Sequence, residues 1–257
     1  MTENQDDQIV TPWDVKGASV DGQVVAIDYT KLITSFGTRE IDSSLLERLE
    51  RLTGQRAHPF LRRGLFFSHR ELNLILDKYE KGKPFYIYTG RGPSSGSMHI
   101  GHMVPFIFCK WLQDVFEATL VIQLTDDEKF LFKPDLKIDD ANKFAIENAK
   151  DIMAFGFDPR RTFIFSNLDY MSGPFYKNVV KIAKSITMNQ SKAAFGFNDR
   201  YYFSLVSHKA VIILAKCTLF LFRLRLPSPT PFLISLDPRE TYLVSFRARL
   251  IKIPTLD

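Results

Sequence analysis

Short apolar runs alternate with amphipathic stretches through the middle of the chain. Three runs are rich in β-branched and aromatic residues and have strand length: residues 85–88, 119–124 and 162–165. The stretches after them have helical periodicity: residues 102–116, a helix capped by Asp139 or Asp140 and ending at Gly156, and residues 175–187. Strands that alternate with helices in this way predict a parallel sheet with right-handed crossovers. We expect an α/β fold, about half of a doubly wound nucleotide-binding domain.

The first 70 residues carry different signals. Residues 12–30 contain β-branched runs split by Asp21-Gly22, which predicts a hairpin. Ser44-Leu-Leu-Glu47 has the pattern of a capping box that opens a short helix, with Gly54 as its C-cap. Ser68-His-Arg-Glu71 is a second such pattern, and the helix after it should run to about Lys81 before Gly82 and Pro84.

Residues 201–257 differ in composition from the rest. They contain eleven leucines but no Gly, Asn, Gln, Met or Trp, although about four glycines are expected at average usage. Val211 to Leu226 is apolar but is interrupted by Lys216, Arg223 and Arg225, so it is a poor membrane span. The composition favours a segment never selected to fold, such as translated intron or frameshifted codons. A divergent helical or membrane-surface tail is the alternative.

The net charge of +5 belongs to this tail. Residues 201–257 hold eight basic and three acidic residues, 8 − 3 = +5, which leaves residues 1–200 neutral. The charge is therefore no argument for nucleic-acid binding by the first 200 residues.

The cysteines and the N-terminus bear on location. Cys109 and Cys217 cannot form a disulfide framework, which fits a reducing compartment. Met1 to Gln8 is polar and acidic, unlike a secretory or organelle signal. We expect a cytoplasmic protein with no membrane association.

The candidate chemistry lies in the loop between the first strand and its helix, Tyr88-Thr-Gly-Arg-Gly-Pro-Ser-Ser-Gly-Ser-Met-His-Ile-Gly-His102. In an open α/β sheet, ligands bind at this edge. Gly90 and Gly92 would let the backbone approach a ligand, and Ser97 could cap a helix whose N-terminus faces an anion. His99 and His102 are three residues apart and should point to one side, while Gly101 leaves room for a flat ring.

This loop matches neither of the two common phosphate-binding motifs. It lacks the Gly-Lys-Ser/Thr of a Walker A loop, and Gly90, Gly92 and Gly96 do not have the dinucleotide-binding spacing. A metal site from His99 and His102 is disfavoured because no third ligand lies nearby in the sequence. An isolated histidine here would be interpreted as a surface residue. Two histidines on either side of an x-Gly pair, at the junction of a strand and a helix, are a far more specific signal.

The residues His99-Ile-Gly-His102 after a strand resemble the first ATP motif of class I aminoacyl-tRNA synthetases. The wider string from Tyr88 resembles the eukaryotic cytosolic tryptophanyl family. Further matching strings are Phe66 to Arg70, Phe106 to Phe116, Leu124 to Phe132, Glu147 to Ile152 and Thr162 to Phe165, ending near Phe195 to Asp199. The resemblance covers about four-fifths of the chain and implies a Rossmann-type parallel sheet.

The resemblance also implies an activity and its residues. The family joins L-tryptophan to ATP as an adenylate, transfers it to tRNA(Trp) and forms homodimers. By resemblance, His99, His102 and Arg91 are catalytic, ATP also contacts Thr89, Gly90, Gly101 and Glu128, and tryptophan contacts Tyr88, Gln123, Thr125 and Glu128. Mg²⁺ would arrive with ATP, with no protein-held metal and no tightly bound cofactor. Without the resemblance, Tyr88 would be read as core packing and Asp126 to Lys129 as a solvated acidic turn.

The chain departs from the family after Asp199. It continues with an unrelated segment and contains no K-M-S-x-S string, the second ATP motif. We therefore divide it into an N-terminal hairpin and helical extension (1–70), the first half of a catalytic domain (71–199) and a non-matching tail (200–257). Loss of one electrostatic donor typically costs 10²–10³ in rate. We expect the chain not to charge tRNA.

Four hypotheses remain open. The chain is a tryptophan–tRNA ligase by descent, or an inactive fragment that binds ATP, tryptophan or a full-length protomer. It is otherwise a product that never accumulates as folded protein, or a nucleotidyltransferase related only by H-x-G-H. Tyrosine is the nearest rival substrate.

Overall fold

The structure is a computed structural model. It describes residues 38–173, Ile33, residues 175–177 and 180, and the backbone of strands at 9–10, 15–16, 19–20, 23–24, 232–236 and 244–250.

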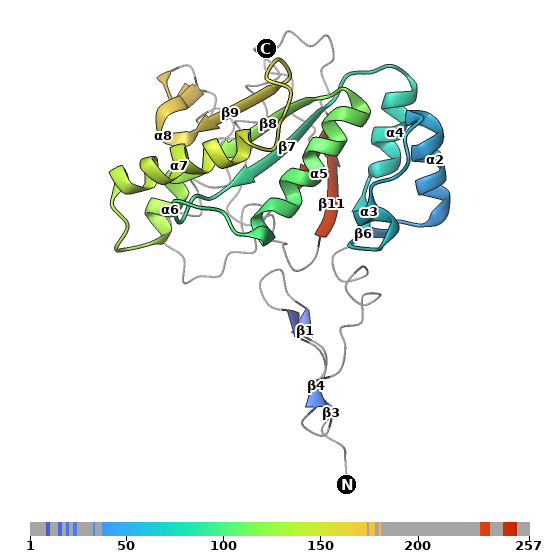
Figure 1. Ribbon diagram of the computed structural model, residues 1–257, viewed down its shortest axis with the longest axis horizontal. Coiled ribbons are helices and arrows are strands. Elements are labelled where there is room, and N and C mark those ends of the chain that lie inside the picture. The colour runs from blue at the N-terminus through green and yellow to red at the C-terminus, as the bar shows by residue number, and fades with distance from the viewer. Residues whose placement is uncertain are drawn as a thin grey trace.

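A seven-stranded sheet forms the centre of the fold (Figure 1). Its strands, in spatial order, are β5 (Arg39–Glu40), β6 (Phe66–Arg70), β11 (Val244–Leu250), β10 (Phe232–Leu236), β7 (Tyr86–Arg91), β8 (Thr119–Leu124) and β9 (Thr162–Ser166). The pairs β7–β8 and β8–β9 are parallel, which confirms the predicted three-stranded parallel unit. The helices are α2 (Ser43–Thr53), α3 (Pro59–Arg62), α4 (Leu72–Glu80), α5 (Ile100–Phe116), α6 (Asp126–Phe132), α7 (Ile138–Met153) and α8 (Asn167–Tyr170).

Alternation along the strands separates two apolar clusters. Ile87, Leu120 and Ile122 pack into the main core with α5, α7 and the N-terminal helices. Tyr86, Tyr88 and Val121 belong to a smaller cluster that also includes Phe165. Since successive side chains of a strand point to opposite faces, the two clusters lie on opposite faces of the sheet. Tyr88 therefore lies on the face away from α5.

Two helix starts differ from the sequence prediction. The N-cap of α2 is Asp42, whose carboxylate accepts from the Leu45 N–H at 2.8 Å, while Ser44 lies inside the helix. Gly54 ends α2 at φ 66°, as predicted. Ser68 caps no helix, because residues 66–70 form β6, and α4 begins only at Leu72.

The later elements follow the prediction more closely. β8 has the predicted bounds, and α5 begins two residues earlier than predicted, at Ile100. Ser97 is exposed and does not cap α5, whose N-cap residue is His99. Asp139 and Asp140 lie in the first turn of α7 rather than at its cap, and Gly156 follows the helix at φ 74°. The predicted helix 175–187 lies largely outside the described residues.

The N-terminal segment contains two short antiparallel pairs. Strands β3 (Ser19–Val20) and β4 (Gln23–Val24) pair Val20 with Gln23, which confirms the hairpin at Asp21-Gly22. Strands β1 (Ile9–Val10) and β2 (Val15–Lys16) form a second pair.

The segment 201–257 contributes two strands to which the sequence analysis assigned no element. β10 runs parallel to β7, β11 runs parallel to β6, and the two are antiparallel to each other. The edge of β7 on the side away from β8 is therefore paired with β10. Since backbone N–H and C=O groups require partners, an open parallel strand is the place where such pairing is most favourable.

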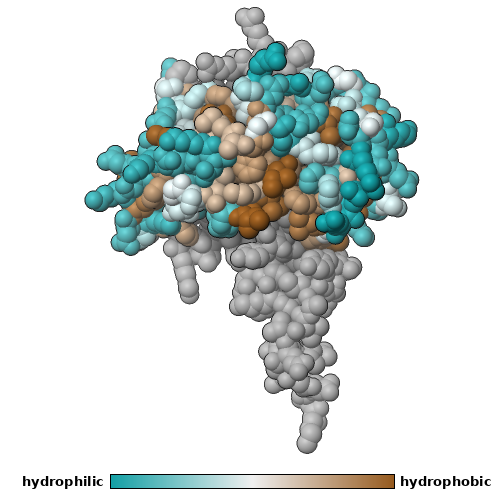
Figure 2. Space-filling model, viewed as in Figure 1, coloured by the Kyte–Doolittle hydropathy of each residue, from teal (hydrophilic) through white to brown (hydrophobic). Residues whose placement is uncertain are grey.

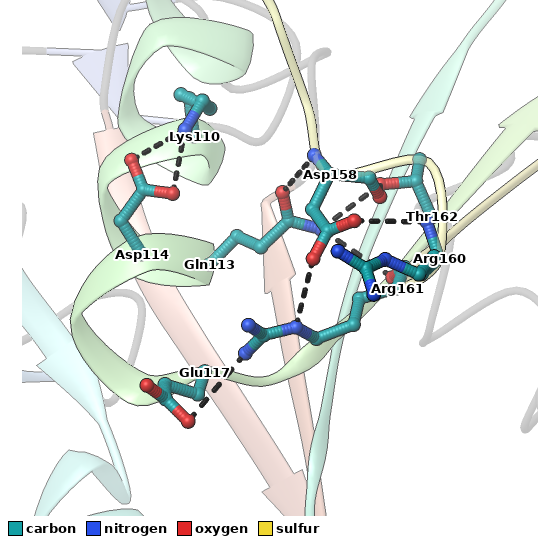
Figure 3. A network of polar contacts seen from close by, with 8 residues as sticks. All are labelled: Lys110, Gln113, Asp114, Glu117, Asp158, Arg160, Arg161 and Thr162. Atoms are coloured by element: carbon teal, nitrogen blue, oxygen red, sulfur yellow. Dashed lines mark hydrogen bonds and ion pairs between the residues drawn. The ribbon is translucent and has the colours of Figure 1, made fainter.

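A polar network fixes the amino-terminal edge of the parallel strands, remote from the loop after β7 (Figure 3). Gln113 of α5 is 1% exposed; its Oε1 accepts from the Asp158 N–H at 2.9 Å and its Nε2 donates to Thr162 Oγ1 at 2.9 Å. Arg161 donates to the Asp158 carboxylate at 3.0 Å and lies 3.7 Å from Glu117. The network ties the end of α5 to the turn before β9.

Apolar side chains gather along α5 on the surface, between polar surfaces of the neighbouring helices (Figure 2). Ile100 is 81% exposed and Ile107 is 38% exposed. Among the helices that the structure describes, none has both the length and the apolar character needed to cross a bilayer.

Candidate functional site

The site is built at the carboxyl ends of β7, β8 and β9. β7 extends to Arg91, three residues into the region predicted as loop, and the chain then runs through residues 92–99 to the start of α5. Thr89 is fully buried, and Thr125 donates its backbone N–H to the Arg91 carbonyl at 2.9 Å, so the ends of β7 and β8 are held together. This arrangement confirms the predicted strand–loop–helix junction.

His99 and His102 lie side by side at the start of α5. Their rings stack with centroids 3.5 Å apart and an interplanar angle of 27°. A Cβ at Gly101 would lie 3.1 Å from the His99 ring, so the flat ring that Gly101 accommodates is that of His99. The prediction that the two imidazoles share one side is confirmed.

His102 is surrounded by positive charge. Burial, together with the charges of Arg91, His99 and Lys129, lowers its pKa to about 4. At neutral pH the ring is therefore uncharged and carries one N–H. Its buried Nδ1 has no hydrogen-bond partner among the described residues.

Arg91 is a buried cation at the end of β7. Its side chain is 6% exposed, and burial lowers its pKa. Nε donates to Asn148 Oδ1 at 3.0 Å, while Nη2 has no partner among the described residues. An unpaired buried donor on a charged group is costly, and an anion from outside the chain would satisfy it.

Tyr88 and Gln123 form one end of a buried polar chain. The Tyr88 hydroxyl donates to Gln123 Oε1, and Gln123 Nε2 donates to Asn167 Oδ1 at 3.2 Å. Asn167 Nδ2 donates in turn to Asp127 Oδ1. The predicted pair is thus brought together, on the sheet face opposite α5. Gly90 lies opposite Gln123 in the β7–β8 register. Because glycine has no side chain, none stands between Gly90 and Gln123.

Sequence reasoning missed Asn167, which links the two predicted residues to the acidic segment. Its position directly after a strand, at the edge where Arg91 and Thr125 also lie, is the signal that could have revealed it.

The acidic segment is not a solvated turn. Asp126 is fully buried and Asp127 is 6% exposed, both in the first turn of α6. The Asp126 carboxylate accepts from the Asn167 N–H at 3.0 Å and from Ser166 Oγ, and burial raises its pKa. The prediction made without the resemblance was wrong because these partners lie about forty residues away in the sequence. Glu128 follows as a half-buried residue.

Lys129, to which the sequence analysis gave no role in the site, lies against the loop. A Cβ at Gly92 would be 2.2 Å from Lys129 Cε, so Gly92 provides space for this lysine. Lys129 is also one of the charges that lower the pKa of His102. Arg91, Lys129 and the N-terminus of α5 thus direct positive charge at one place. Within the described residues no group of three His, Cys, Asp or Glu side chains could hold a metal.

A parallel sheet with a histidine pair at the first helix N-terminus and a buried arginine beside it defines a nucleotide-binding catalytic domain. The chain belongs to the class I tRNA synthetases of the tryptophan and tyrosine family, whose model, tRNA synthetases class I (W and Y), matches residues 80–208.

Comparison with individual proteins indicates which members of this family the chain resembles. The chain is 66% identical over 194 residues to the cytoplasmic tryptophan–tRNA ligase of Schizosaccharomyces pombe, a match that covers 76% of this chain and 49% of that protein. The structure matches tryptophanyl-tRNA synthetase from Trypanosoma brucei with a TM-score of 0.71 and 42% identity, over 86% of this chain and 72% of that one. The Encephalitozoon cuniculi enzyme bound to tryptophan matches with a TM-score of 0.72 and 40% identity, over 87% and 69% of the two chains. The chain spans about half the length of the curated relatives that it matches.

Proposed function

We propose that the chain is a cytoplasmic tryptophan–tRNA ligase by descent and carries the part that activates L-tryptophan with ATP; transfer to tRNA(Trp) is the family's second step, which we expect this chain, lacking a K-M-S-x-S string, not to complete. One observation carries the proposal: Arg91 Nη2, at the end of β7, and His102 Nδ1, in the first turn of α5, are buried and lack partners among the described residues, and the charge of Arg91 acts on His102. Two such donors fit the oxygens of a polyphosphate.

In the first step a carboxylate oxygen of tryptophan forms a bond to the α-phosphorus, and the bond from that phosphorus to the pyrophosphate oxygen breaks. Negative charge grows on the phosphoryl oxygens. Arg91 opposes this charge as a fixed cation, and His102 donates a hydrogen bond from a neutral ring, because its pKa of about 4 keeps it uncharged at pH 7. His99 stacks on His102 and fixes the orientation of its ring. Thr89, Gly90 and Gly101 form the backbone along which the nucleotide lies.

The amino acid is placed on the opposite face of β7. Tyr88 and Gln123 provide an aromatic wall and an amide that can accept the indole N–H, with Thr125 beside them. Gln123 Oε1 now accepts from Tyr88, and an amide oxygen has two lone pairs, so the same atom can serve both donors. Glu128 is assigned to the substrate ammonium group and to ATP. Mg²⁺ is carried by the phosphates and water.

Pyrophosphate exchange tests the proposal. Labelled pyrophosphate should enter ATP only when the purified chain and L-tryptophan are both present, and L-tyrosine should not replace tryptophan. His102→Asn should lower the exchange rate by about 10²–10³, the usual cost of losing one electrostatic donor. Lys150→Ala, a change at an exposed side chain of α7, should leave the rate unchanged.

A second candidate function is binding without turnover, favoured by the absence of a K-M-S-x-S string from the sequence. Tight binding of ATP and tryptophan with no exchange would support it. Failure of the folded chain to bind either ligand would refute both. The homodimer implied by the family is part of the proposal, and sedimentation velocity measures it directly.

A further inference from the structure

Asn148 of α7 lies at the point where three parts of the molecule meet. Its side chain is fully buried, and Oδ1 and both Nδ2 hydrogens have protein partners. Oδ1 accepts from Arg91 Nε at 3.0 Å, while Nδ2 donates to the Ser95 carbonyl at 2.7 Å and to the Phe144 carbonyl at 2.9 Å. These partners come from the end of β7, from the loop and from the preceding turn of α7.

Only an amide satisfies these partners. Arg91 Nε requires an acceptor, and the two carbonyls can only accept, so a side chain that bonds to all three must offer an acceptor and donors on adjacent atoms. A carboxylate would face two carbonyl oxygens with no proton to share. It would also pair with the guanidinium and cancel its charge, whereas the neutral amide orients Arg91 and leaves its positive charge available.

The same face of α7 holds the loop at neighbouring points. Asp151 Oδ2, almost one turn after Asn148, accepts from the Met98 N–H at 3.3 Å. Phe144, one turn before Asn148, lies 3.8 Å from the position of a Cβ at Gly96. Residues 144, 148 and 151 share one side of the helix, so α7 acts as a rigid template for loop residues 95–98.

We infer that Asn148 is a positioning residue that fixes the Arg91 guanidinium and the 92–98 loop for a polyphosphate. The inference rests on the proposed function. It concerns ATP and pyrophosphate rather than the amino acid, because Tyr88 and Gln123 are held by a different network, through Asn167.

The test compares two ligands on the full chain. Asn148→Asp and Asn148→Ala should weaken binding of ATP by about 10- to 100-fold, which is the usual contribution of one or two hydrogen bonds to a charged group. Binding of L-tryptophan should change by less than about twofold, whereas a merely structural role would weaken both ligands together. Asn142→Ala is the matched control, since this asparagine lies on the same helix and, among the residues that the structure describes, its side chain donates only to Asp169.

The outcomes separate the two levels of the argument. If the wild-type chain binds no ATP, the proposed function and this inference both fail. If it binds ATP and Asn148→Asp binds equally well, the inference alone fails. If both variants fail to fold, the test uses the wild-type chain instead. Its Arg91 Nε–H signal is observed by ¹⁵N NMR and is identified by its loss in Arg91→Lys. That proton should stay protected from solvent exchange with and without ATP, and loss of protection on adding ATP would overturn the inference.

Discussion

Replacement of Gln113 by leucine tests whether burial or distance decides the strength of a polar contact in this fold. Gln113 is 1% exposed and makes two hydrogen bonds of 2.9 Å, to the Asp158 N–H and to Thr162 Oγ1. On the same helix, Lys110 lies only 2.5 Å from Asp114, but the two side chains are 29% and 55% exposed.

The magnitude follows from what each change leaves behind. Leucine at 113 fills a similar volume but strands the Asp158 N–H. Two neighbouring groups keep a hydrogen bond in the variant. Thr162 still donates to the Asp158 carbonyl, and the Arg161 carbonyl still accepts from the Leu120 N–H. One orphaned donor costs about 1–3 kcal/mol and the lost bonds about 1 kcal/mol each, partly offset by apolar burial. We expect a net loss of about 2–4 kcal/mol. Lys110→Ala should cost no more than about 0.5 kcal/mol, since exposed ion pairs contribute little.

Urea denaturation followed by circular dichroism measures both variants. With an m-value of about 3 kcal/mol/M for a chain of this size, Gln113→Leu should lower the midpoint by about 1 M, and Lys110→Ala should barely move it. If the two midpoints fall equally, or if Lys110→Ala costs more, the reasoning from burial is refuted.

Three further predictions concern the site and the core. The folded pKa of His102 is about 4 against an ordinary 6.5, so the unfolded chain takes up its proton first and the free energy of unfolding falls as pH drops from 6.5 to 4. His102→Asn should flatten that part of the stability curve, and an unchanged curve would contradict the assignment. Gly92→Ala should displace the Lys129 side chain, because the new Cβ would lie 2.2 Å from its Cε, and should weaken ATP binding about 10-fold with little loss of stability. Gly173→Ala, which lies outside the loop and whose new Cβ would meet nothing within 4 Å, is the control, and equal affinities for the two variants would count against a role for Lys129. Cys109 is fully buried and burial raises its pKa, so in a Cys217→Ser background the native protein should not react with a disulfide reagent at pH 8 until denaturant is added.

The regular elements could be predicted because their signals are local. The apolar run 119–124 forms β8 with the predicted bounds. Gly54 ends α2 and Gly156 follows α7, both with positive φ, as expected. The histidine pair could be placed on one side from its spacing alone, because both residues fall within one helical turn.

The misses have non-local causes. Ser68 has the sequence of a helix cap, but its backbone pairs with Glu40 on one side and Ser245 on the other, and strand pairing overrides the local preference. The burial of Asp126 depends on Ser166 and Asn167, and the alignment of Arg91 depends on Asn148. No local pattern encodes such contacts, because they exist only after the sheet and α7 have formed.

The position of β10 and β11 has a consequence for the order of synthesis. β6 and β7 are consecutive strands in the sequence but are not neighbours in the sheet, since β10 and β11, which come much later in the sequence, lie between them. Until Leu250 has emerged, the nascent chain holds two incomplete half-sheets with open edges. Closing the gap late brings together segments far apart along the chain, which is the slow kind of folding step. The sheet should therefore not close before residues 232–250 have been synthesised, and until then the edges of β6 and β7 are open to other strands or to a chaperone.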